Sequence, residues 1–137
     1  MDKFIGDALM AVFSAPLELK RHENAAIDCA IQMRKNMDKL NLELVDLDLP
    51  PVSIGIGINS GEAIVGNMGS DTRFDYTCIG SSVNEAARLE SSCKEVGVDL
   101  IIGRSTALKS DHICKELPPI KVKGVARELQ IYTLLED

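Results

Sequence analysis

An aspartate stands directly after a glycine near the start of the chain, where Gly6 and Asp7 precede the short apolar run 8–13. Glycine permits a tight backbone turn, and a carboxylate held at the rigid head of a buried strand is suited to a divalent cation, which prefers oxygen ligands. An isolated Gly-Asp pair has a second interpretation, in which the aspartate only caps backbone amides in a turn. The pair is therefore a candidate metal site whose identification depends on the rest of the sequence.

A second set of polar residues is spaced for one face of a helix. Asn84 and Arg88 are four positions apart, so in a helix they project from the same face about one turn apart. Residues 82–85, SVNE, have the pattern of a capping box and predict a helix that begins at about Val83. A capped surface helix whose arginine pairs with a nearby acid, such as Glu85, would show the same pattern.

The elements that would position these residues follow from the spacing of apolar positions. Between residues 23 and 45 apolar side chains recur every three or four positions, which predicts a helix packed on a sheet; they are Ala26, Ala30, Met33, Met37, Leu40 and Leu44. Residues 8–13 predict a short buried strand, and the alternation over residues 52–58 predicts another. A turn at residues 59–61 followed by residues 63–65 predicts a hairpin.

The alternating strand carries glycine on one side. Gly55 and Gly57 lie opposite the isoleucines and indicate that something approaches this face closely. It could be a nucleotide, a partner subunit or a tightly packed helix. Further strands are expected at residues 98–102, 120–123 and 129–134, and a short helix at 105–108. Strands mixed with helices indicate an α+β fold, with helices packed on one sheet.

Four segments together resemble the catalytic domain of the class III adenylyl and guanylyl cyclases. They are MDKFIGD at residues 1–7, SIGIGINSG at 53–61, FDYTCIGSSVNEAARLE at 74–90 and VKG at 122–124, so the resemblance covers essentially the whole chain. It implies a ferredoxin-like antiparallel sheet with helices packed on one face, and a single partial catalytic domain over residues 1–137. Two positions depart from the family pattern: Ser81 stands where aspartate is usual, and Glu85 where an apolar residue is usual.

The resemblance implies nucleotide cyclisation, in which the ribose 3′-hydroxyl of ATP attacks the α-phosphorus and pyrophosphate leaves. Two divalent ions, Mg²⁺ or Mn²⁺, suit this reaction, and Asp7 would be one of two aspartates that bridge them. The family carries the other aspartate in a Phe-x-Asp-(Ile/Leu)-x-Gly-Phe motif ahead of the position of Met1, on a strand central to the sheet. Because the 137 residues lack this motif, we expect the chain to be N-terminally truncated, or to be a partial domain that another segment must complete, and to be inactive or nearly so by itself.

Lys3 and Thr77 match the two positions that contact the base in adenylyl-type members of the family. A lysine ammonium can donate to adenine N1, whereas guanylyl-type members usually carry glutamate there, and the Thr77 hydroxyl can accept from the adenine amine. Taken singly, a solvated surface cation and an ordinary strand threonine would be the better interpretations. Taken together, the two residues favour ATP and the bacterial adenylyl type.

Asn84, Arg88 and Lys123 match the family positions that hold the ribose and the phosphates. The resemblance implies that Asn84 orients the ribose, that Arg88 stabilises charge developing on the α-phosphate, and that Lys123 reaches the terminal phosphates. A strand-end lysine that protects a sheet edge is the alternative for Lys123. Family members dimerise head to tail, with metal aspartates from one protomer and the other site residues from its partner, so the resemblance implies a homodimer with composite sites.

The composition of the chain limits the classes of partner that it can bind. The chain has 15 basic and 21 acidic residues, a formal net charge of −6 and no basic block, which argues against polymeric nucleic acid but allows a mononucleotide. Its four cysteines are isolated from one another and are expected to be buried free thiols of a reducing compartment. With no signal peptide and no membrane-spanning run, we expect a cytoplasmic domain, or the cytosolic part of a larger protein with an attached sensor domain.

The sequence therefore predicts the catalytic domain of an adenylate cyclase, a phosphorus-oxygen lyase that makes cyclic AMP. Two other functions fit the same residues. One is a non-catalytic module of the same fold that binds nucleotide or dimerises for regulation, and the other is a guanylyl cyclase.

Overall fold

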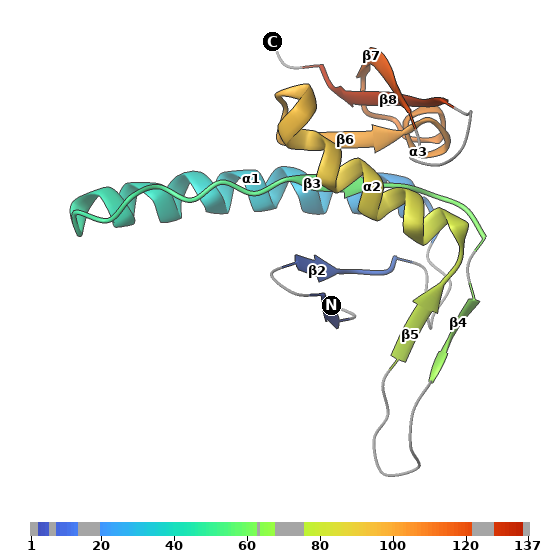
Figure 1. Ribbon diagram of the computed structural model, residues 1–137, viewed down its shortest axis with the longest axis horizontal. Coiled ribbons are helices and arrows are strands. Elements are labelled where there is room, and N and C mark those ends of the chain that lie inside the picture. The colour runs from blue at the N-terminus through green and yellow to red at the C-terminus, as the bar shows by residue number, and fades with distance from the viewer. Residues whose placement is uncertain are drawn as a thin grey trace.

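The computed structural model describes residues 3–5, 8–13, 20–62, 64–67, 76–121 and 128–135 (Figure 1), and for residues 3–5, 64–67 and 76–79 it describes the backbone alone. The elements in these ranges are β1 (Lys3–Ile5), β2 (Ala8–Met10), α1 (His22–Asp46), β3 (Ile56–Ile58), β4 (Ile64–Asn67), β5 (Tyr76–Ile79), α2 (Ser81–Val96), β6 (Leu100–Gly103), α3 (Arg104–Lys109), β7 (Cys114–Lys121) and β8 (Glu128–Leu134). This mixture of helices and strands confirms the α+β class. Of the described helices, none is long and apolar enough to cross a membrane.

A four-stranded sheet in the order β3-β6-β8-β7 is the largest sheet in the described ranges. Strand β3 runs parallel to β6, with Ile56 opposite Leu100 and Ile58 opposite Ile102, whereas β8 is antiparallel to both β6 and β7. Strands β1 with β2, and β4 with β5, form two further antiparallel pairs. The sheet expected to be antiparallel thus contains one parallel pair, because the connection from β3 to β6 includes the crossover helix α2.

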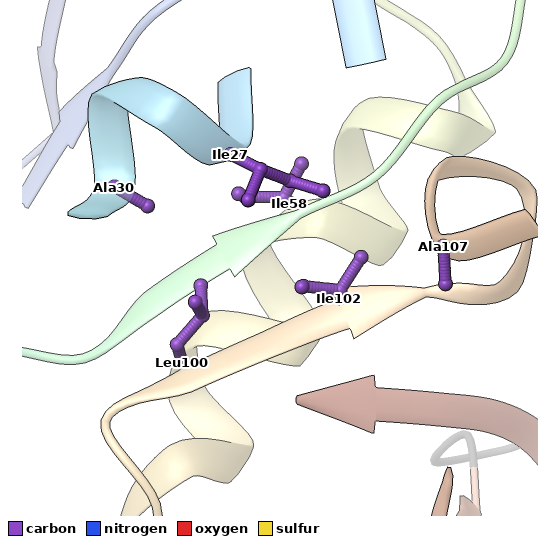
Figure 2. Close-up of a cluster of buried hydrophobic side chains, with 6 residues drawn as sticks. All are labelled: Ile27, Ala30, Ile58, Leu100, Ile102 and Ala107. Carbon is purple, nitrogen blue, oxygen red and sulfur yellow. The ribbon is translucent and has the colours of Figure 1, made fainter. Parts of the chain in front are cut away.

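Helices cover both faces of this sheet, not one. Successive residues of a strand point to opposite faces, and Leu100 and Ile102 of β6 contribute to a buried cluster with α1, while Ile101 joins a second cluster with Leu89 of α2. Figure 2 shows the first cluster, which consists of Ile27, Ala30, Ile58, Leu100, Ile102 and Ala107. Because β6 is buried on both sides, its sequence is a continuous apolar run without alternation.

The helix predicted over residues 23–45 is confirmed as α1. Its contact with the sheet is made by the first half, where Ile27 and Ala30 are buried. Farther along, Leu42 is 70% exposed and Val45 is 58% exposed, and this end of α1 extends past the sheet in Figure 1. The apolar spacing thus predicted the helix correctly, but the predicted packing on the sheet holds only for its first half.

The hairpin predicted for residues 52–65 is wrong. Within residues 52–58 only β3 forms a strand, and β4 pairs with β5 and not with β3. The prediction assumed that strands close in sequence pair with each other. Strand β3 ends at Ile58, and the residue that follows it, Asn59, donates a side-chain hydrogen bond to α2.

The strand predicted over residues 8–13 is shorter and less buried than expected. It is confined to β2, which pairs with β1, and Leu9 at its centre is 52% exposed. Gly6 and Asp7 lie between the two paired strands in the sequence and are outside the described residues.

Near the C-terminus the prediction misses the start of β7. The other elements predicted there correspond to β6, α3 and β8. Strand β7 begins at Cys114, well before residue 120, and continues through Pro118 and Pro119 across a register shift between Leu117 and Ile120. Prolines are tolerated here because β7 is at the edge of the sheet and the irregularity interrupts its pairing.

Candidate active site

Helix α2, which carries both predicted helix-borne site residues, lies directly against the glycine side of β3. A methyl carbon added to Gly57 would stand 2.5 Å from the carbonyl oxygen of Ala86 and closer still to the amide nitrogen of Glu90. One added to Gly55 would stand 3.1 Å from Cβ of Cys93. Of the three explanations for these glycines, a tightly packed helix is confirmed. The two missing side chains determine how closely α2 approaches the sheet.

The first turn of α2 is held by hydrogen bonds to the connection between β3 and β4, and not by the predicted capping box. The helix begins at Ser81, earlier than predicted, and has no side-chain cap. The Ser82 hydroxyl donates to the carbonyl oxygen of Glu62 at 2.8 Å, and the Glu85 carboxylate accepts from the Asn59 amide at 3.2 Å. The capping-box prediction is wrong because both side chains bind groups outside the helix.

The Arg88 guanidinium is half-buried beside the end of strand β7. Its Nη2 atom donates to the carbonyl oxygen of Lys121, the last residue of β7, at 3.1 Å. Its Nε atom is buried and has no hydrogen-bond partner among the described residues. An unbonded buried donor costs about 1–3 kcal/mol. Lys123, a predicted phosphate ligand, follows Lys121 by two positions and is outside the described residues.

Asn84 shares helix α2 with Arg88, as the sequence predicted. Its side chain is exposed, whereas that of Arg88 is half-buried. Because the two residues are four positions apart, both side chains leave the same face of α2. An amide and a guanidinium on one helix face can contact two neighbouring groups of one ligand.

The structure describes little of the residues that were predicted to contact the base and the metal ions. Lys3 lies in β1, and Thr77 lies in β5 opposite Gly66 of β4, where only the backbone is described. Because β5 ends directly before α2 begins, Thr77 is close in sequence to the helix that carries the other candidates. Asp7 is outside the described residues.

The described side chains do not form a metal centre. Among them, no group of three or more His, Cys, Asp and Glu residues is placed to hold a metal ion. Binding of Mg²⁺ or Mn²⁺ through Asp7 therefore stays a prediction that rests on the resemblance.

The residue that sequence reasoning missed is Asn59, which it treated as part of a turn. A signal for its role was present. Asn59 directly follows a strand with glycine on one face, so it is the first side chain beyond the strand able to hydrogen-bond to whatever packs on that face.

Three of the cysteines are free thiols in different environments: Cys93 is buried, Cys114 is half-buried and Cys29 is exposed. Burial raises the pKa of both Cys93 and Cys114. The Cys93 thiol lies at the contact between α2 and β3, 3.5 Å from the Ile56 carbonyl oxygen. The expected burial is correct for Cys93 and wrong for Cys29, while the side chain of Cys78 is outside the description.

Sequence comparison links the chain to known cyclases. The family model for the adenylate and guanylate cyclase catalytic domain matches residues 3–136. An adenylate cyclase of Anabaena cylindrica is 34% identical over 96% of this chain and 27% of its own length. Adenylate cyclase 1 of Rhizobium meliloti is 30% identical over 97% of this chain and 20% of its own length. The chain therefore spans little more than a quarter of these relatives at most.

Solved structures of cyclases share the fold. The adenylyl cyclase CyaB from P. aeruginosa has a TM-score of 0.85 and 37% identity, with 99% of this chain and 71% of that chain covered. The guanylyl cyclase Cya2 has a TM-score of 0.83 and 27% identity, with 97% of this chain and 68% of that chain covered. Since cyclases of both base specificities match, the comparisons leave the choice between ATP and GTP open. The family match spans nearly all residues, and the chain belongs to the adenylate and guanylate cyclase catalytic domain family.

Proposed function

We propose that the protein converts ATP to cyclic AMP and pyrophosphate. The observation that carries this proposal is the match of residues 3–136 to the cyclase catalytic domain family, together with Asn84 and Arg88 on one helix. Guanidinium groups bind phosphate oxygens through paired N–H donors. In a protein of the cyclase family, a nucleotide phosphate is the acceptor that we expect for the Arg88 guanidinium.

Arg88 and Asn84 have separate roles in this proposal. Arg88 donates to the α-phosphate oxygens as negative charge increases on them in the transition state. Asn84, one turn earlier on the same face of α2, holds the ribose so that its 3′-oxygen is in line with the α-phosphorus. Donors directed at transition-state charge typically contribute about 3–4 kcal/mol. Both contributions depend on how α2 is placed on β3.

The preference for ATP over GTP rests on Lys3 and Thr77. A lysine ammonium donates hydrogen bonds only, which suits the unprotonated N1 of adenine and opposes the N1–H of guanine. Guanylyl cyclase activity is the second candidate, and the fold similarity to the guanylyl cyclase Cya2 supports it. A non-catalytic regulatory module is the third, since family membership alone does not establish turnover.

Metal ions and phosphate contacts complete the proposed site. Asp7 would hold a divalent ion, Mg²⁺ or Mn²⁺. Two such ions, when bound, lower the pKa of the ribose hydroxyl and offset the charge of the phosphates. Lys123 would contact the terminal phosphates and stabilise the departing pyrophosphate.

We further propose a cytoplasmic homodimer in which each site is composite. Asp7 would come from one protomer, and Lys3, Thr77, Asn84, Arg88 and Lys123 would come from its partner. A symmetric dimer of this kind has two equivalent sites.

Product analysis tests the activity. The longest form of the protein that the gene encodes is incubated with ATP or GTP and Mg²⁺ or Mn²⁺, and cyclic nucleotides are separated chromatographically. We expect cyclic AMP to exceed cyclic GMP, and Arg88→Ala to lower turnover by about 10²–10³-fold, the loss typical of a transition-state donor. Arg104→Ala on α3 removes an exposed arginine and is the matched control, expected to leave turnover unchanged.

Two results would contradict the proposal. Nucleotide binding without any cyclic product would favour the regulatory module, and cyclic GMP in excess would favour the guanylyl activity. An assay of the 137-residue chain beside the longest form tests the expectation that the shorter chain is nearly inactive.

A further inference from the structure

Asn59 links strand β3 to the first turn of α2. It is half-buried directly after β3. Its Nδ2 atom donates to the main-chain oxygen of Ser82 at 3.0 Å and to the Glu85 carboxylate at 3.2 Å. Both acceptors lie near the start of α2. One amide group therefore binds the helix at a backbone atom and at a side chain.

The surroundings of Asn59 keep its side chain in place. A methyl carbon added to Gly103, at the end of β6, would overlap Oδ1 of Asn59, so this glycine leaves the room that the amide occupies. The next residue, Ser60, shares a hydrogen bond of 2.6 Å with Thr106 of α3. The Ser82 hydroxyl returns a hydrogen bond of 2.8 Å to the carbonyl oxygen of Glu62. The connection after β3 is thus bonded to both α2 and α3.

We propose that Asn59 is a positioning residue that fixes the first turn of α2 and, through it, the placement of Asn84 and Arg88. Asn84 lies between Ser82 and Glu85, the two residues that Asn59 binds. Asn59 contacts no substrate in this proposal and acts only through the helix. The inference rests on the proposed cyclase function for its effect on turnover, but the placement of α2 can be measured without it.

The chemistry of this contact requires a donor at position 59. An asparagine amide has two N–H groups and can serve a carbonyl and a carboxylate together. An aspartate of nearly the same shape has only acceptors and would face the Ser82 oxygen and the Glu85 carboxylate with a second negative charge. The family resemblance leads us to expect an apolar residue at position 85. The Asn59 amide provides the Glu85 carboxylate found there with a specific partner.

These donor and acceptor roles can be exchanged by mutation. In Asn59→Asp both hydrogen bonds are lost and two carboxylates face each other. In Asn59→Asp combined with Glu85→Gln, the new glutamine amide can donate to the new aspartate, which restores one of the two bonds with reversed polarity. Glu85→Gln alone keeps an acceptor for Asn59. The matched control is Asn41→Asp, because Asn41 also donates to a backbone carbonyl, that of Val52 at 2.9 Å, but lies on α1.

Two readouts are made on the longest form of the protein. The first is kcat and KM for ATP, normalised to the folded fraction measured by circular dichroism. The second is hydrogen exchange of the first-turn amides Val83 and Asn84, both of which bond to the carbonyl oxygen of Gly80. Asn59→Ala, which removes the donors without adding charge, replaces Asn59→Asp if that variant does not fold.

We expect Asn59→Asp to lower kcat by about 10- to 100-fold, since a displacement of about 1 Å can have that effect, and to raise KM less than kcat falls. The first-turn amides should exchange at least about tenfold faster, which corresponds to roughly 1.4 kcal/mol of local stability. The double variant should recover a large part of both losses. Asn41→Asp should change neither value more than about twofold, and Glu85→Gln alone should change both values less than Asn59→Asp does.

The proposal is overturned if the first-turn amides of the Asn59→Asp variant exchange at the parental rate. It is also overturned if the double variant has the same exchange rates and the same kcat as the single variant. It also fails if Asn41→Asp lowers normalised kcat as much as Asn59→Asp does. Absence of cyclic nucleotide from the parental protein would instead refute the proposed function. In that case hydrogen exchange alone decides whether Asn59 places α2.

Discussion

Replacing Gly57 with alanine should displace α2 from β3 and lower the free energy of unfolding by about 3 kcal/mol. The added methyl carbon would stand 2.5 Å from the Ala86 carbonyl oxygen and nearer still to the Glu90 amide nitrogen, whereas favourable contacts need about 3.5–4.0 Å. Both neighbours are backbone atoms, so no side chain can rotate away and the helix or the strand must move by about 1 Å. Overpacking costs about 1–3 kcal/mol, and these two rigid contacts favour the upper end.

Two other glycines provide graded controls. A methyl carbon on Gly55 would meet Cβ of Cys93 at 3.1 Å and the Glu90 carbonyl oxygen at 3.2 Å. Shifts of a few tenths of an ångström relieve these contacts, so we expect a loss below about 1 kcal/mol. Gly97 has φ of +86° and nothing within 4 Å of an added methyl carbon. Alanine there is strained only by its backbone conformation, by about 1–2 kcal/mol.

Thermal and urea unfolding measure the three losses. A loss of 1 kcal/mol lowers Tm by roughly 2–8 °C for domains of ordinary size, so Gly57→Ala should lower Tm by roughly 10 °C and the two controls by a few degrees each. The urea m-value should stay unchanged if unfolding remains two-state. A Gly57→Ala protein as stable as Gly55→Ala would show that α2 does not lie against β3 as described.

Three further predictions concern the site and the thiols. Lys3→Glu should weaken ATP use far more than metal binding, because a carboxylate cannot donate to adenine N1; a variant with the parental ATP to GTP preference would refute the assigned role. Gly103→Ala should push aside the Asn59 amide and lower kcat, and parental kinetics would contradict this. Iodoacetamide should modify the exposed Cys29 much faster than the buried Cys93, and equal alkylation rates would refute this assignment. Burial also raises the pKa of Cys93, which slows its alkylation further because the thiolate is the nucleophile.

The long, regularly patterned elements could be predicted from the sequence. The three- and four-residue spacing over residues 23–45 identified α1 almost to its ends, because one apolar stripe on a helix leaves a strong periodic signal. The glycine face of β3 predicted a close neighbour but not which one. Only the folded chain shows that α2 is that neighbour, since contacts between distant segments leave no local pattern.

Two of the failed predictions share one cause, which is that local patterns were assigned local partners. The SVNE run has the pattern of a capping box, yet Ser82 and Glu85 bind residues of the connection after β3. Residues 59–61 resemble a hairpin turn, yet Asn59 bonds to α2. In the candidate site, the spacing of Asn84 and Arg88 was predictable because it is a property of one helix. The contact of Arg88 with Lys121 was not predictable, because it joins α2 to β7.

Mixing two inactive variants tests the central claim, a cyclase whose composite sites use Asp7 and Arg88 from different protomers. Asp7→Ala and Arg88→Ala should each be nearly inactive as homodimers of the longest form of the protein. In a heterodimer one site then carries both substitutions and the other carries neither, so cyclic AMP production should reappear after subunit exchange, toward about half the parental rate per heterodimer. If heterodimers form, as shown by differently tagged subunits, and no cyclic AMP appears, the composite site and the assignment of Arg88 opposite Asp7 are contradicted.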